Sequence, residues 1–299
     1  MSILVVGSVA LDSIRTPFGE VEDILGGSAT HFSVAASFFN RVRLVAVVGE
    51  DFPPEHIDFL ASRNIDLGGL KRVPGKTFRW KGYYEFDLND AHTVDTQLNV
   101  FEDFDPDIPE EYRDSEYVFL ANIHPALQLK VLEQMRSPRL VVCDTMNFWI
   151  ESQRQALLET IARVDYLLLN DAEARQLADE PNLVAAGRKL LTMGPRRVII
   201  KKGEHGVIML GKGVFFSLPA YPLETVFDPT GAGDSFGGGF LGSLSRYPAM
   251  SDEEVRRSIV YGSVVASYNV ESFSCDRLRD LTAEEIEDRY REFTAITCF

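Results

Sequence analysis

The hydrophobic positions of this chain fall into short runs that alternate with longer segments of helical periodicity. The short runs are rich in valine, isoleucine and leucine, and they predict strands at residues 3–7, 44–49, 117–121, 140–144, 166–169, 198–201 and 207–210. The longer segments predict helices at residues 29–39, 54–62, 125–135, 154–161, 171–178, 183–193, 234–245, 252–268 and 283–293. This alternation is typical of βαβ units, so we expect an α/β fold around a mostly parallel sheet.

One region departs from the alternation. Residues 77–86 and 93–101 predict two β segments joined by a polar turn, with a third partner around residues 14–25. Aromatic rings in such segments pack over a sugar or stack on a base, and they equally form one face of an ordinary sheet or a dimer interface. Both explanations stay open for the five rings of the first segment, which are Phe78, Trp80, Tyr83, Tyr84 and Phe86.

Residues 228–240, DPTGAGDSFGGGF, combine a loop of small residues with a carboxylate and a helix start. Gly231, Ala232 and Gly233 let backbone N–H groups converge at the helix N-terminus, where the aligned peptide dipoles favour an anion. Asp234 opposes anion binding there unless it accepts a proton from a hydroxyl that attacks a phosphate. A plain glycine-rich helix start with an Asp cap is the alternative. The motif indicates phosphoryl transfer with Asp234 as general base.

The same thirteen residues resemble the C-terminal signature of the ribokinase or PfkB carbohydrate kinases. Residues 26–36, GGSATHFSVAA, are similar to the di-glycine sugar-binding turn of that family. The resemblance implies a single PfkB-type kinase domain over residues 1–299, folded as a three-layer α/β/α sandwich. It also implies a small β-sheet lid, formed by about residues 12–25 and 76–103, above an alcohol that receives the γ-phosphate of ATP. A lid excludes the water that competes with this alcohol.

The resemblance places the acceptor pocket beyond the carboxyl end of the first strand. Asp12 matches the aspartate with which the family binds sugar hydroxyls, although an Asp in a turn has the same appearance. Members of the family often carry Asn where this chain has His31. The expected substrate-binding residues are Asp12, Gly26, Gly27, His31 and Asn122.

On the donor side, Asn170 and Glu173 resemble the N-x-x-E motif that orders the water shell of Mg²⁺ in the family. A helix-capping box has the same letters. Residues 203–206 resemble the G-x-x-G turn beside the nucleotide, with a β-hairpin turn as the alternative. A late helix resembles the wall of the adenine site. The expected contacts with ATP are therefore Lys201, Gly203, Gly206, Gly262 and Val265.

Asp228 and Thr230 have two open explanations. In related kinases, oxygen atoms around this loop hold a monovalent cation, which makes K⁺ a candidate beside ATP and Mg²⁺. An Asx turn formed by Asp228 before Pro229 is the other explanation.

Composition excludes several classes of partner. The net charge is −15, from 30 basic and 45 acidic residues, whereas nucleic acid and anionic membranes require a basic surface. No run approaches the roughly 18 apolar residues of a membrane span, and the first residues lack the features of a signal peptide, so we expect a cytoplasmic protein. The 3 widely spaced cysteines indicate neither a disulfide framework nor a zinc site.

The sequence thus predicts a carbohydrate or nucleoside kinase that acts on a small-molecule sugar or nucleoside, with dimerisation through the lid left open. A catalytically silent nucleotide- or sugar-binding regulator on the same fold is disfavoured because Asp234 and Glu173 are both present. A nicotinamide oxidoreductase is disfavoured because residues 7–10 lack the Gly-x-Gly-x-x-Gly turn.

Overall fold

The computed structural model describes residues 1–298 and is built around a large sheet of nine strands. These strands are β1 (Ser2–Val6), β4 (Arg41–Gly49), β5 (Ile65–Val73), β8 (Tyr117–Leu120), β9 (Leu140–Cys143), β10 (Tyr166–Asn170), β11 (Arg197–Lys201), β12 (Val207–Gly211) and β13 (Val214–Leu218). Their order is β13-β12-β11-β10-β9-β8-β1-β4-β5. All pairs from β5 to β11 are parallel, and only the β11–β12 and β12–β13 pairs are antiparallel. The predicted mostly parallel sheet is therefore confirmed.

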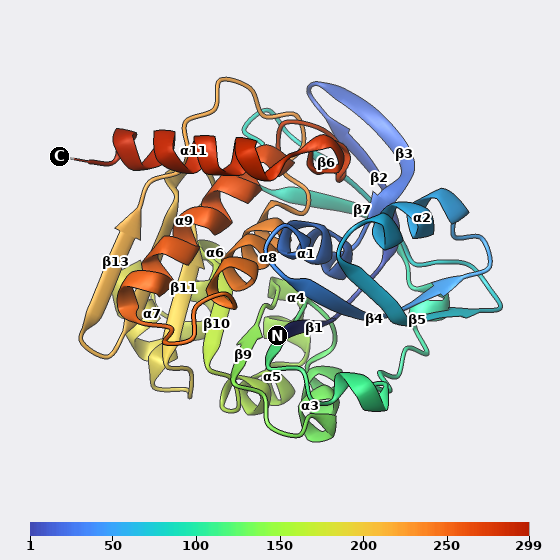
Figure 1. Cartoon of the computed structure of the whole chain (residues 1–299), viewed down its shortest axis with the longest axis horizontal. Helices are drawn as coiled ribbons and strands as arrows, with labels where there is room; N and C mark the ends of the chain where they lie inside the picture. Colours follow the sequence, from blue (N-terminus) through green and yellow to red (C-terminus); the bar gives the residue numbers. More distant parts are fainter. Residues whose placement is uncertain (299) are drawn as a thin grey trace.

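Helices cover both faces of this sheet, which gives the three layers that we expected (Figure 1). One face carries α1 (Ser28–Ser37), α2 (Pro54–Ser62), α8 (Ala232–Leu244), α9 (Asp252–Asn269), α10 (Asp276–Asp280) and α11 (Ala283–Ile296). The other face carries α3 (Pro125–Gln134), α4 (Asn147–Ser152), α5 (Arg154–Ile161), α6 (Asp171–Ala178) and α7 (Leu183–Leu191). The central strands are buried on both sides, which explains their continuous apolar runs.

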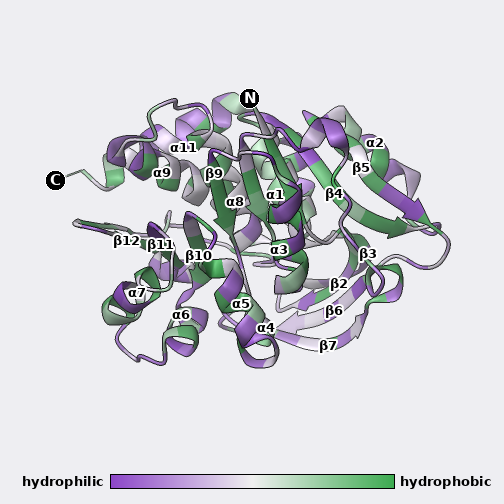
Figure 2. Ribbon diagram, turned by 90° about the horizontal axis from the view of Figure 1, so that it is seen from below, coloured by the Kyte–Doolittle hydropathy of each residue, from purple (hydrophilic) through white to green (hydrophobic). Residues whose placement is uncertain are grey.

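A separate four-stranded sheet lies beside the large one (Figure 2). It contains β2 (Ala10–Thr16), β3 (Gly19–Gly26), β6 (Arg79–Tyr84) and β7 (Ala91–Gln97), in the order β3-β2-β6-β7. The two β segments predicted at residues 77–86 and 93–101 are thus strands, and the segment around 14–25 is their partner. The second strand ends earlier than predicted, because residues 99–101 form a 3₁₀ turn that begins at Asn99 with φ near 50°.

Close helix packing brings the N-terminal end of α8 to the carboxyl edge of the sheet. A Cβ atom on Gly238 would collide with the carbonyl oxygen of Phe32, and one on Gly242 would lie 3.1 Å from Cα of Ala36. Both contacts belong to α1, so the small residues of α8 allow the two backbones to approach. No helix within residues 1–298 combines the length and apolar character that crossing a bilayer would require.

Candidate active site

The loop at residues 228–234, called the anion loop below, leads into the first turn of α8. Gly231 adopts φ near 73°, and a Cβ atom there would collide with the ring of His31. Within residues 1–298, the N–H groups of Gly231 and Gly233 make no hydrogen bond to the chain, whereas the N–H of Ala232 donates to the carbonyl of Pro229 over 3.1 Å. Two of the three predicted amides are therefore free to bind an anion, and the third is already engaged.

Asp234 is half-buried at the lip of this loop. Burial and, to a smaller extent, the charge of Asp144 raise the pKa of its carboxyl group, the ammonium group of Lys201 opposes both, and the resulting pKa is about 8. Lys201 ends β11, and its Nζ lies 2.9 Å from Oδ2 of Asp144 and 2.9 Å from the place that a Cβ atom on Gly233 would occupy. The predicted base and the predicted donor-side lysine thus meet at the anion loop.

Glu173 brings another carboxyl group to this cluster. It is buried, and burial raises its pKa to about 7 while Lys201 opposes the shift. Glu173 and Asn170 form the capping box of α6: the N–H of Asn170 donates to Oε2 over 2.7 Å, and the N–H of Glu173 donates to Oδ1 over 2.8 Å. The two residues therefore form the helix cap that the sequence offered as the alternative explanation. Binding of magnesium is a second role that we expect of the same residues.

Asp12 lies on β2 and is buried against the di-glycine turn. A Cβ atom on Gly26 would collide with its carboxylate, and Gly27 adopts φ near 97°. Burial raises the pKa of Asp12 to about 7, the N–H of Gly27 lowers it, and the charge of Asp228 raises it. The three predicted acceptor-side residues Asp12, Gly26 and Gly27 therefore lie together.

His31 lies beneath the anion loop. Its ring is only 2% exposed, and Nδ1 lies 3.1 Å from Oδ1 of Asn269. Burial lowers the pKa of His31 to about 4, so the ring is neutral near pH 7, and the Nδ1–H tautomer is the one that donates to Asn269. The structure places His31 as a support of Gly231, and the substrate contact expected of it stays a prediction.

Asn269, at the end of α9, connects three residues of the site, which are Thr230, Ser235 and His31. Its Oδ1 accepts from Ser235 Oγ over 3.0 Å, and its Nδ2 donates to the carbonyl of Thr230 over 2.8 Å. Together with the contact to His31, these bonds engage both the oxygen and the nitrogen of a buried amide, and leaving such groups unpaired is costly. Asn269 therefore fixes the shape of the anion loop from below.

Asp228 and Thr230 form the turn that the sequence left open. The N–H of Thr230 donates to Oδ1 of Asp228 over 2.9 Å, which is an Asx turn, and the N–H of Ser274 donates to Oδ2 over 3.3 Å. The hydroxyl group of Thr230 donates to the hydroxyl oxygen of Tyr84 over 3.1 Å. The structure therefore contains the Asx turn that the sequence offered as one explanation of Asp228 and Thr230. This turn does not exclude a bound cation.

The remaining predicted contacts lie around this centre. Asn122 is half-buried, donates to Met146 Sδ over 3.0 Å and accepts from Trp149 Nε1 over 2.8 Å. Gly203 and Gly206 bound a 3₁₀ turn with positive φ values, and a Cβ atom on Gly203 would lie 3.5 Å from Oδ1 of Asn89 in the β6–β7 loop.

Gly262 and Val265 are buried where α9 packs on α8. A Cβ atom on Gly262 would lie 2.8 Å from the carbonyl oxygen of Phe236, and the side chain of Val265 has no exposed surface. The structure therefore gives both residues a place in helix packing, and the adenine contact expected of them stays a prediction.

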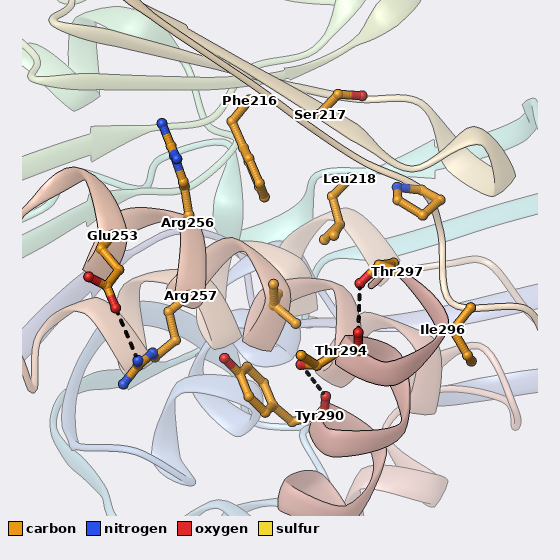
Figure 3. Close-up of a pocket in the computed structure, with 12 residues that line it drawn as sticks. Phe216, Ser217, Leu218, Glu253, Arg256, Arg257, Tyr290, Thr294, Ile296 and Thr297 are labelled. Carbon is orange, nitrogen blue, oxygen red and sulfur yellow. Dashed lines mark hydrogen bonds and ion pairs between the residues drawn. The ribbon is translucent and has the colours of Figure 1, made fainter. Parts of the chain in front are cut away.

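A cavity of about 460 Å³ lies elsewhere, between β13, α9 and α11 (Figure 3). Phe216 and Tyr290 contribute to its walls, and Arg257 pairs with Glu253 at one side. None of the predicted site residues lines this cavity. The convergence of Asp234, Lys201 and Glu173 therefore identifies the candidate active site better than cavity size does.

Sequence reasoning missed three residues of the site. Asp144 directly follows β9, and a carboxylate at the carboxyl end of a parallel strand was a usable signal. Tyr84 was noted only as one of five aromatic residues. Asn269 lies within a helix of ordinary amphipathic pattern, and nothing in its sequence context points to the loop.

Comparisons with known proteins give matches over most of the chain. A sequence model of the pfkB family carbohydrate kinases matches residues 2–280. The chain is 32% identical to a cytidine kinase from Thermococcus kodakarensis over 82% of this chain and 89% of that enzyme. It is 26% identical to a ribokinase from Lactococcus lactis over 86% and 88% of the two chains. The crystal structure of a nucleoside kinase from Methanocaldococcus jannaschii superimposes with a TM-score of 0.77 at 21% identity, covering 97% of this chain and 98% of that one.

The raised pKa of Asp234 predicts that stability depends on pH. The pKa lies at 3.8 in the unfolded chain and at about 8 in the folded protein. The associated stabilisation is therefore fully present below the lower value and is lost as pH rises through the higher one. We expect the free energy of unfolding of the ligand-free protein to fall from pH 5.5 to 8.5 more steeply than that of Asp234→Asn, as measured by urea denaturation at fixed ionic strength.

Asp58→Asn is the control for this measurement, because Asp58 is exposed on α2. This variant should keep the slope of the unchanged protein. Parallel stability profiles for Asp234→Asn and the unchanged protein would contradict the raised pKa.

Proposed function

The chain belongs to the pfkB family of carbohydrate kinases, and we propose that within this family it is a nucleoside kinase with Asp234 as general base. It is an ATP-dependent enzyme that phosphorylates an alcohol of a sugar or a nucleoside. One observation carries the assignment of the base: a half-buried carboxylate stands beside free backbone amides and a lysine at the start of α8.

The proposed chemistry follows from this arrangement. Asp234 accepts the proton of the acceptor alcohol as its oxygen attacks the γ-phosphate. A raised pKa of about 8 suits this role, because the ionised group binds a proton more strongly than an ordinary carboxylate does. The N–H groups of Gly231 and Gly233 and the ammonium group of Lys201 stabilise the negative charge of the transferring phosphoryl group.

The acceptor side supports a nucleoside. Asp12 offers carboxylate oxygens to vicinal hydroxyl groups such as those of ribose. Strand register pairs Asp12 with Trp80, so the two side chains share the face of the small sheet that carries the buried Ile14. The indole ring extends over Gly82, where a Cβ atom would collide with it, and its Nε1 donates to Thr93 over 3.1 Å. A fixed flat ring beside a ribose-binding carboxylate suits a base, and the cytidine kinase relative acts on a nucleoside by its name.

We propose Mg²⁺ at the donor side, bound through water by Asn170 and Glu173. The residues fit this ion, because the carboxyl groups of Asp144, Glu173 and Asp234 share a single ammonium group, that of Lys201. Oxygen ligands and water are what Mg²⁺ prefers. When bound, the ion neutralises charge on the phosphates of ATP.

Two further expectations stay predictions. One is a location in the cytoplasm. The other is pairing of two chains through the small sheet, and it has some support in β7, an edge strand in which every residue is exposed.

K⁺ at Asp228 and Thr230 is a separate part of the proposal. Asp228 has no exposed surface, burial raises its pKa, and within residues 1–298 no basic side chain forms an ion pair with it. A monovalent cation would stabilise this buried carboxylate.

We expect higher kinase activity in KCl than in choline chloride at equal ionic strength, and equal activity in the two salts would contradict the cation site.

The acceptor is tested by ADP release over a panel of pentoses, hexoses, inositols and nucleosides, with ATP and Mg²⁺. We expect kcat/KM for the best nucleoside to exceed that of free ribose by at least about tenfold, because only the nucleoside has an aromatic base to stack on Trp80. A free sugar as the best acceptor would contradict the nucleoside assignment and leave the kinase assignment intact.

Asp234→Asn tests the general base. We expect turnover to fall by at least about 10²-fold with folding and ATP binding retained, because the amide keeps the shape of the carboxylate and cannot accept the proton. Turnover, unfolding and nucleotide affinity are measured together, with Asp58→Asn as the control. Near-normal turnover in Asp234→Asn would exclude the proposed base.

A further inference from the structure

Tyr84 connects the small sheet to the anion loop. It is the last residue of β6 and is only 9% exposed, whereas Phe86 two residues later is 94% exposed. Its cross-strand partner Ala91 is exposed. The burial of the Tyr84 ring therefore comes from contact with the body of the protein and not from its own sheet.

The contact is made at a fixed point of the loop. Thr230 Oγ1 donates to the Tyr84 hydroxyl oxygen over 3.1 Å. The backbone of Thr230 is held on two other sides, by its N–H bond to Asp228 and by the bond that its carbonyl accepts from Asn269. A displacement of Tyr84 thus acts on a residue that lies four positions before Asp234.

The phenol also lies within the range of charges from both halves of the proposed reaction. Burial raises the pKa of Tyr84, and the charges of Asp228, Asp12 and Asp234 raise it further. The group therefore stays protonated, so that its oxygen accepts from Thr230 and its hydrogen remains a donor. Asp12 belongs to the proposed acceptor side and Asp234 is the proposed base, so charges from both sides act on the Tyr84 phenol.

We propose that Tyr84 is a positioning residue, whose hydroxyl group couples closure of the small sheet over the acceptor to the placement of the anion loop and Asp234. When the small sheet moves away, the bond to Thr230 is lost and the loop is less well fixed. Closure of the small sheet therefore favours transfer to the alcohol over transfer to water, because the loop reaches its working geometry only when the acceptor is covered. This inference rests on the proposed function.

Tyr84→Phe removes the hydroxyl group and keeps the ring. We expect kcat for the preferred acceptor to fall at least about tenfold, since small misplacements of reacting groups are costly, while KM for ATP changes less than about twofold. The ratio of acceptor-independent ATP hydrolysis to phosphoryl transfer should rise. An unchanged kcat and an unchanged ratio would overturn the proposal.

Tyr83→Phe is the matched control. Tyr83 is the adjacent residue of the same strand, its ring stacks on His92 with centroids 4.9 Å apart, and within residues 1–298 its hydroxyl group makes no hydrogen bond. Strand alternation directs it to the opposite face of the small sheet. This variant should keep the kinetics of the unchanged protein.

A double-mutant cycle with Thr230→Val separates coupling from a general loss. If the two hydroxyl groups act through their mutual bond, Tyr84→Phe should have little further effect on kcat in the Thr230→Val background. Independent, additive losses would show that Tyr84 does not act through Thr230.

Hydrogen exchange gives a readout that needs no acceptor. In the ligand-free protein, Tyr84→Phe should speed amide exchange in residues 79–97 and 228–234, and Tyr83→Phe should not. Unchanged exchange in both segments would overturn the proposal. The two possible failures are distinguishable, because absence of transfer to any nucleoside by the unchanged protein would refute the proposed function and leave the exchange result standing.

Discussion

The candidate active site depends on an imbalance of charge around one ammonium group. The ammonium group of Lys201 pairs with Asp144. It also lies close enough to the carboxyl groups of Glu173 and Asp234 to lower their pKa values. Burial and the charge of Asp144 hold the pKa values of Glu173 and Asp234 well above those of free carboxylic acids, at about 7 and about 8. The ligand-free site is thus a strained arrangement that a cation or a transferred proton relieves, and this is the condition that general-base catalysis needs.

Glycine and small residues make this imbalance sterically possible. Gly231 leaves room for the ring of His31 beneath the loop, and Gly233 leaves room for the ammonium group of Lys201 above it. Asn269 then fixes the loop by a hydrogen-bond network in the protein interior. The geometry of the candidate site is therefore set by packing from α1 and α9 as much as by the residues of the anion loop.

The sequence predicted the regular part of the fold well, because buried parallel strands and amphipathic helices leave strong periodic patterns. It missed β5 and β13, which are edge strands, since the pair Gly68–Gly69 interrupts the first and half-exposed aromatic residues occupy the second. It also missed α4 and α10, which are too short to show a helical period.

At the site, motif residues such as Asp234, Glu173 and Asp12 were predictable because their chemistry is unusual for their position. Asn269 and the bond between Tyr84 and Thr230 were not, because these contacts join residues that are distant in the chain. Their importance depends on tertiary geometry, which no local pattern carries. His31 is the converse case. Its position in the motif predicted a contact with the substrate, whereas its ring packs beneath Gly231 and contacts Asn269.

The approach of the β6–β7 loop to the turn at Gly203 has a consequence for how such an enzyme diversifies. Asn89 comes from the hairpin that carries Trp80, which we propose to stack on the acceptor, and Gly203 belongs to the turn that we expect beside the nucleotide. Insertions or exchanges in this hairpin tip therefore alter the surroundings of both proposed binding sites at once. Selection for a new acceptor at this tip is consequently constrained by the need to keep the phosphate donor in place.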